Sequence, residues 1–304
     1  MNGRDRRLLA RYAATRVVGI AALGGLTTLG VGVFGTTTAD GAGQPPAGTT
    51  PVATSVTFSV NLRVALPGQY ATQMRARGKT DFVHQAVETS VTLPTAGLHA
   101  SLPQSAGSLL GTKPLSLKAI WVNSHAYVTV PPSLSALVGG AQVLSIPVST
   151  ADAHQVATAF TQSSVALTYS HLLLGQLPGL PKQHHVADKT INGVKSTGTQ
   201  VDLTVAELLK VVPGLAPAMT DDAKALGQVT IPVTVWVDRA GRLVEVAMAA
   251  TNASTGSISG TVQFTNYNSP VHVSAPAASS VKPAPAVVQQ LLGSLDLFGV
   301  TPFA

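Results

Sequence analysis

Residues 52–66 read VATSVTFSVNLRVAL, a stretch in which apolar and polar side chains largely take alternate positions. Side chains on a β-strand point to opposite faces in turn, so this period of two gives the strand one apolar and one polar face. Val56, Phe58, Val60 and Leu62 share the apolar face. The stretch therefore predicts a long antiparallel strand with one face against a hydrophobic core.

The same alternation recurs along most of the chain. Asn192-Gly193 separates two such runs and suits a two-residue hairpin turn, because both turn positions need a positive φ. Asp238 to Gly241 separates another pair. About ten strands with short connections predict an α+β fold built on an antiparallel sheet. The expected strands are 52–66, 70–80, 82–93, 115–122, 126–130, 186–191, 194–203, 231–237, 243–250 and 257–267.

Helical signals are few and lie in the connections. The longest helical region is expected at about 149–174, and a capping box at Thr204 to Glu207 predicts a short helix over 205–212. Another short helix is expected over 220–227. Apolar residues at helical spacing over 287–298 predict a C-terminal amphipathic helix.

The N-terminus predicts export. Five arginines precede residue 17, and residues 17–39 are uncharged and mostly apolar, the order typical of a signal segment. Two alternatives stay open: cleavage near the small residues 37–39, or retention of Val17 to Gly35 as an anchor of roughly 29 Å. Arg6-Arg7 leaves both the general and the twin-arginine export routes open.

The chain divides into four parts. Residues 1–39 form the signal peptide or membrane anchor, and residues 40–51 form a flexible linker by composition. Residues 52–282 form the β-rich domain. Residues 283–304 form a Pro/Ala linker with the short amphipathic helix. The protein is therefore expected at the cell envelope, either anchored in the membrane or secreted.

The net charge of +6 lies mainly in the export segment. Five of the 19 basic and one of the 13 acidic residues precede Asp40, which leaves 14 basic against 12 acidic residues. This small excess is too weak for binding a phosphate backbone, so we expect no nucleic-acid partner.

The sequence lacks several common catalytic motifs. The chain has no cysteine, no serine flanked by glycines as in a nucleophile elbow, and no His-Glu-x-x-His motif. His184 and His185 are adjacent and would point to opposite faces of a strand. Asp221 and Asp222 suit the first turn of a helix. We therefore expect no enzyme, no catalytic residue, no metal site and no cofactor.

Three basic residues, Arg75, Arg77 and Lys79, alternate along one expected strand and share a face opposite Met74 and Ala76. One interpretation is contact with anionic lipid headgroups at a membrane surface. The alternative is an ordinary solvated sheet face.

The C-terminal half resembles a known family. Ile191-Asn192-Gly193-Val194, then IPVTVWVDRAGRLVEVAM from Ile231, then FTNYNSPVHVSAPAASSV from Phe264 follow each other as in the LppX/LprG (LppX_LprAFG) lipoproteins of actinobacteria, within the LolA-like group. The resemblance implies a curved antiparallel half-barrel of the LolA/LolB type, closed by a few helices around an apolar cavity. It also implies a carrier for acylated lipids or lipoglycans. The lipobox cysteine of that family is absent.

If that implication holds, the partners are an acylated lipid or glycolipid, a membrane surface and an unidentified envelope transporter. The alternative function is a secreted or anchored structural or protein-binding β-domain with a filled core. The two differ in whether the apolar face of the sheet holds a ligand. The residues expected to line the cavity are Val56, Phe58, Val60, Leu62, Val233, Val235, Val237, Val244, Val246, Met248, Ile258, Val262 and Phe264.

Overall fold

The computed structural model describes residues 52–65, 72–93, 114–132, 135, 138–168, 183–204, 230–252 and 256–285. The expected export segment, the linker and the helices over 205–212, 220–227 and 287–298 lie outside these residues. Within the described ranges, no helix has the length and apolar character needed to cross a bilayer.

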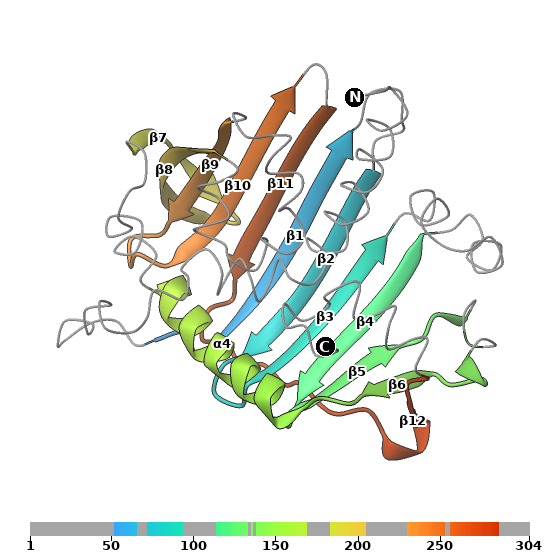
Figure 1. The fold of residues 1–304 in the computed structure, drawn as a ribbon. Helices are drawn as coiled ribbons and strands as arrows, with labels where there is room; N and C mark the ends of the chain where they lie inside the picture. Colours follow the sequence, from blue (N-terminus) through green and yellow to red (C-terminus); the bar gives the residue numbers. More distant parts are fainter. Residues whose placement is uncertain are drawn as a thin grey trace.

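Twelve strands form one sheet (Figure 1). All neighbours pair antiparallel except β12 and β6, which pair parallel. The ten strands expected from the sequence are all present, and β6 and β12 are additional. In their order across the sheet, the strands are β12 (Val281–Pro283), β6 (Val143–Ile146), β5 (His125–Thr129), β4 (Leu115–Val122), β3 (Ala86–Leu93), β2 (Thr72–Asp81), β1 (Ser55–Ala65), β11 (Gly256–Thr265), β10 (Leu243–Asn252), β9 (Thr230–Val237), β8 (Val194–Thr204) and β7 (His184–Ile191).

The first strand begins later than its sequence pattern predicts. β1 begins at Ser55, and Val52 and Thr54 are exposed while Ala53 is buried. The Thr54 amide and hydroxyl both donate to Asn268 Oδ1, at 2.8 and 3.2 Å. These contacts hold residues 52–54 outside the sheet ladder, so the alternation of the sequence continues where the strand does not.

The helix α4 (Thr150–Thr168) packs at one end of the sheet (Figure 1). Thr168 Oγ1 accepts a hydrogen bond from the Ala53 amide at 2.8 Å, and Ser164 Oγ donates to the Ala53 carbonyl. Phe160 contacts Phe82 edge to face, with ring centroids 6.4 Å apart. The helix is therefore fixed to the start of β1 and to the β2–β3 turn. The expected continuation to residue 174 lies outside the described residues.

Two hairpin turns adopt the backbone conformation that their sequences favour. Asn192 and Gly193 have φ of 49° and 81°, as predicted for a two-residue turn between β7 and β8. Asn123 and Ser124 have φ of 52° and 58° between β4 and β5. Asparagine and glycine tolerate this left-handed region better than other residues.

An extended segment, residues 266–280, leads from β11 to β12. Ser55 Oγ donates to the carbonyl of Ser269 at 2.6 Å, and the Asn268 amide donates to the carbonyl of Ser55 at 3.0 Å. Further on, Val273 packs in a small core with Ile120 and Val122. The segment ends in η3 (Ala278–Ser280), and β12 then pairs with β6.

Candidate functional site

One face of the sheet is apolar through most of its strands. Backbone register places Phe58 beside Phe264 and Val60 beside Val262. Val262 in turn lies beside Val246, and Val246 beside Val235. We call this surface the apolar face. Its buried members include Val56, Phe58, Val60 and Leu62 of β1, Met74 and Ala76 of β2, Val91 of β3, Ala119 and Trp121 of β4, Val201 and Leu203 of β8, Ile231, Val233 and Val235 of β9, Val246 of β10, and Val262 and Phe264 of β11.

Two glycines at the centre of the apolar face leave space for neighbouring side chains to lie close to the sheet. Gly78 is the register partner of Phe58, and a Cβ added at Gly78 would lie 2.1 Å from Phe58 Cζ. The Phe58 ring therefore lies over Gly78 instead of standing upright from the sheet. Gly260 pairs with Leu62, and its added Cβ would lie 3.1 Å from Leu62 Cδ1. The face thus consists mainly of small and medium side chains.

The thirteen residues expected to line a cavity lie on the strands that carry the apolar face. Ten of them are buried: Val56, Phe58, Val60, Leu62, Val233, Val235, Val244, Val246, Val262 and Phe264. Val237 and Met248 are half-buried, and Ile258 is the register partner of Ala250 and Val64. A bulge between Leu243 and Glu245 leaves Val244 without a partner on β9. Their role as the lining of a lipid cavity stays a prediction.

The opposite face of the central strands is polar and basic. Arg75 and Arg77 are exposed there, while Met74 and Ala76, which alternate with them along β2, are buried. Lys79 Nζ lies 3.9 Å from Glu88. The sheet therefore separates all three basic residues from anything that lies on the apolar face. Their expected contact with headgroups stays a prediction, and it requires a membrane on the polar side.

At the far edge, the β7–β8 hairpin folds over the polar face. Lys189 Nζ of β7 lies 2.6 Å from Glu245 Oε1 of β10, three strands away. In a flat sheet, these strands would be about 14 Å apart at about 4.8 Å per strand, a distance that only fully extended side chains could span. Figure 1 shows the β7–β8 hairpin bent out of the plane of the central strands, which brings the two side chains closer. Lys189 Nζ also lies 3.4 Å from the centroid of the Trp236 ring.

The bend buries polar side chains that the strand pattern predicts to be solvated. Only 6% of the Glu245 side chain is exposed, and its second oxygen accepts a hydrogen bond from Gln263 at 2.7 Å. Trp236 fits because its partner on β8 is Gly198, where an added Cβ would lie 2.6 Å from Trp236 Nε1. The Trp236 Nε1 atom is buried and has no hydrogen-bond partner among the residues that the structure describes.

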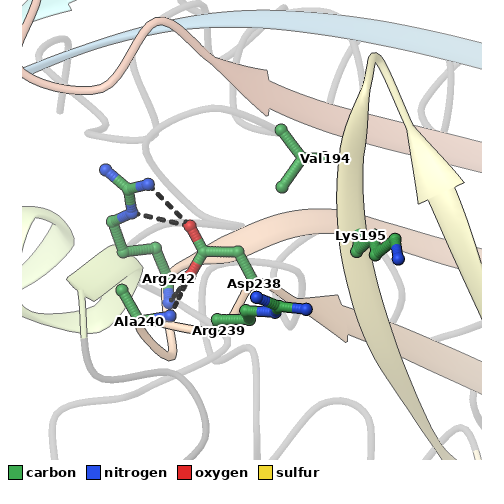
Figure 2. A pocket seen from close by; sticks show the side chains of 6 residues that line it. All are labelled: Val194, Lys195, Asp238, Arg239, Ala240 and Arg242. Atoms are coloured by element: carbon green, nitrogen blue, oxygen red, sulfur yellow. Dashed lines mark hydrogen bonds and ion pairs between the residues drawn. The ribbon is translucent and has the colours of Figure 1, made fainter.

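A pocket of about 550 Å³ lies between this hairpin and the β9–β10 turn (Figure 2). Register places both turns at the end of the sheet where α4 packs. The pocket is separate from the centre of the apolar face. Its lining residues are Val194, Lys195, Asp238, Arg239, Ala240 and Arg242.

Asp238 organises one wall of the pocket. Its Oδ1 accepts hydrogen bonds from the amides of Ala240 and Arg242, both at 2.9 Å. Its Oδ2 accepts from Arg242 Nε and lies 2.7 Å from Arg242 Nη2 (Figure 2). The Arg242 guanidinium also lies 5.1 Å from the centroid of Tyr267. Four donors therefore surround a carboxylate that is only 6% exposed, which fixes the turn.

Tyr267 supports this wall from behind. Its hydroxyl donates to the carbonyl of Leu243 at 2.6 Å. Burial, and secondly the Asp238 charge, raise the pKa of the Tyr267 phenol far above its ordinary value, with Arg242 acting in the opposite direction. The hydroxyl thus stays protonated and remains a donor at every physiological pH.

The two adjacent histidines of the sequence lie at the edge of the sheet. His184 and His185 are both exposed at the start of β7, and His185 Nε2 lies 3.5 Å from Asp188. Among the described residues, no three His, Asp or Glu side chains gather as a metal site would require. Asp221 and Asp222 lie outside the described part of the chain.

Several solved structures are similar to this chain at low sequence identity. No protein-family model matches the chain, and no curated sequence matches it significantly. The fold resembles LppX and LprF. The lipoprotein LppX of Mycobacterium tuberculosis is 14% identical, with 73% of this chain and 90% of LppX covered and a TM-score of 0.37. LprF of Mycobacterium bovis is 13% identical, with 74% and 90% covered and a TM-score of 0.39.

A LolA superfamily protein of Nitrosomonas europaea is 8% identical, with 74% of this chain and 89% of that protein covered and a TM-score of 0.23. The names of these neighbours are those of the groups that the sequence resembles. The identities and TM-scores are too low to transfer a function to this chain.

The sequence did not indicate the pocket or the buried Lys189–Glu245 pair. The β9–β10 turn was recognisable from Asp238 to Gly241, and the β7–β8 turn from Asn192-Gly193. Nothing in either turn signals that the two lie side by side, because that contact depends on the bend of the sheet.

Proposed function

We propose that this chain is an exported lipid carrier that holds the acyl chains of a lipid or lipoglycan on the apolar face of its sheet. The carrying observation is the apolar face itself, which continues in register from Val235 across β10, β11 and β1 to Ala76 of β2. In this proposal the sheet is a curved half-barrel that helices close, and α4 is one of them. The protein acts at the cell envelope without catalysing a reaction.

The energetics of lipid extraction favour such a surface. An acyl chain of about fifteen carbons loses roughly 12 kcal/mol on leaving a bilayer, at about 0.8 kcal/mol per CH₂. Only a broad apolar surface can compensate for this loss. Valine, alanine and glycine predominate over large aromatic residues along the central strands, which leaves space above the sheet for a chain.

A structural β-domain with a filled core is the second candidate. It is favoured by the low exposure of the same residues, because Val56 and Phe58 are already only 1% and 2% exposed. Side chains packed this tightly would leave no room for a ligand. The two candidates therefore make opposite predictions for added volume on the apolar face.

The test introduces a tryptophan on the apolar face of β9 or of β10, and on the polar face of β10 as a control. Val235→Trp and Val246→Trp add a large ring to the apolar face, and Ala249→Trp adds the same ring to an exposed position of the polar face as a control. A carrier should keep its unfolding midpoint in all three variants. It should lose retention of a fluorescent fatty acid only in the first two.

A filled core gives the reverse result. Overpacking should then cost about 1–3 kcal/mol in Val235→Trp and Val246→Trp but not in Ala249→Trp. Native mass spectrometry of the exported protein, followed by organic extraction, provides an independent readout. A single ligand-free mass together with no saturable fatty-acid binding would refute the carrier.

A further inference from the structure

We propose that the pocket between the β7–β8 and β9–β10 turns binds an anionic phosphate ester. This site differs from the apolar face in position and chemistry. It could serve the headgroup of a phospholipid or a free soluble ester. The inference does not depend on whether the apolar face holds acyl chains.

The pocket has a net positive charge when the ion pair between Asp238 and Arg242 is counted as neutral. Asp238 is the sole carboxylate among the lining residues, and it is saturated by the Ala240 and Arg242 amides and by the Arg242 guanidinium. Lys195 and Arg239 form no ion pair with any residue that the structure describes. Two positive charges therefore line the pocket with no counter-charge from the described chain.

The two cations come from different hairpins. Lys195 follows the β7–β8 turn, and Arg239 lies at the tip of the β9–β10 turn, so they border the pocket from two elements (Figure 2). Tetrahedral phosphate has oxygens in several directions and can accept hydrogen bonds from both sides at once. Lysine and arginine are the residues that most often bind phosphate in proteins.

The walls of the pocket are held in place without a ligand. Asp238 fixes the β9–β10 turn, and Gly241 with φ of 79° allows the chain to reverse there. The Lys189–Glu245 ion pair holds the β7–β8 hairpin against the sheet. The backbone that carries the two cations is therefore already fixed, which reduces the entropy lost on binding.

The size of the pocket favours an ester over inorganic phosphate. Its volume is about 550 Å³. One phosphate group would leave most of this space to solvent. A phosphate with a glycerol-sized substituent fills it better, and Val194 and Ala240 provide apolar contact for the carbon atoms.

The test uses the full chain in a fixed concentration of a mild non-ionic detergent at low ionic strength. Isothermal titration measures binding of sn-glycerol 1-phosphate, inorganic phosphate and dihexanoyl phosphatidylglycerol. The pocket variant is Lys195→Gln/Arg239→Gln. The control variant, Arg63→Gln/Lys118→Gln, removes the same charge from the polar face of β1 and β4.

We expect saturable binding of glycerol phosphate, tighter than that of inorganic phosphate. The pocket variant should weaken it by about tenfold for each cation removed, and the control variant by less than about twofold. Competition by dihexanoyl phosphatidylglycerol would assign the site to a lipid headgroup, and its absence would assign the site to a soluble ester. Both results support the site.

Two results would overturn the proposal. The first is no saturable binding of any of the three probes. The second is equal weakening in the pocket and control variants, which would show only an effect of net charge. Fatty-acid retention by the pocket variant is measured in parallel, so failure of this site is distinguished from failure of the carrier function.

Discussion

Replacing Lys189 by methionine tests the bend that folds the β7–β8 hairpin over the polar face. The lysine donates to Glu245 at 2.6 Å and lies 3.4 Å above the Trp236 ring. A hydrogen bond between charged groups contributes about 1.5–3 kcal/mol, and a cation–π contact at a partly exposed site about 0.5–1 kcal/mol. Lys189→Met should therefore reduce the free energy of unfolding by about 2–4 kcal/mol. Part of this cost arises because Glu245 stays buried with only Gln263 as a partner.

The assay is urea denaturation at pH 7, in which such a loss lowers the midpoint by about 1 M. Lys118→Met is the matched control, because Lys118 pairs with Glu88 at 3.1 Å but both side chains are considerably exposed. This exposed pair should contribute less than about 1 kcal/mol. Adding Glu245→Gln to Lys189→Met removes the unpaired charge and should recover part of the stability. Two results would refute a stabilising role of the buried pair. One is an equal loss of unfolding free energy in Lys189→Met and Lys118→Met, and the other is a double variant that is less stable than Lys189→Met.

Two further predictions concern the Asn268 contact and the basic polar face. Asn268→Ala should cost about 2 kcal/mol in urea denaturation, because it loses the hydrogen bonds from Thr54 and places alanine at a φ of 58°. Asn268→Gly keeps that φ without strain and should cost less, and a reversed order would contradict this account. Arg75→Gln/Arg77→Gln should weaken sedimentation with phosphatidylglycerol vesicles by about thirtyfold, from about 1 kcal/mol per residue. Phosphatidylcholine vesicles serve as the control, and unchanged sedimentation with the anionic vesicles would indicate an ordinary solvated face.

Local sequence signals predicted most of the sheet because many of its strands form hairpins with tight turns, as β7 with β8 and β9 with β10 do. The alternation from Val56 to Leu62 predicted which residues of β1 are buried. Asn192-Gly193 predicted the turn between β7 and β8, since the required positive φ is a property of those residues. These signals do not depend on distant parts of the chain.

Contacts between distant segments could not be predicted in this way. β6 has only four residues, and β12 contains a proline, so neither has a recognisable strand pattern. Their parallel pairing joins Val143 to Val281, far apart in the chain. Glu245 occupies a polar-face position, where strand alternation alone would place a solvated side chain, but the folded hairpin covers it. Burial of this kind depends on the bend of the sheet, which strand periodicity does not encode.

The motif that carries the family resemblance determines the structure of the β9–β10 hairpin and does not by itself indicate a ligand. Val233 and Val235 lie on the apolar face, while Trp236 packs over Gly198 on the other side. Asp238 binds the turn, and Gly241 supplies its positive φ. These five motif residues thus have a structural reason at the β9–β10 hairpin, and a protein without any lipid would need the same residues. What the chain binds must therefore be decided at positions outside the motif's structural role: by the volume above the apolar face, and by the free charges of the pocket.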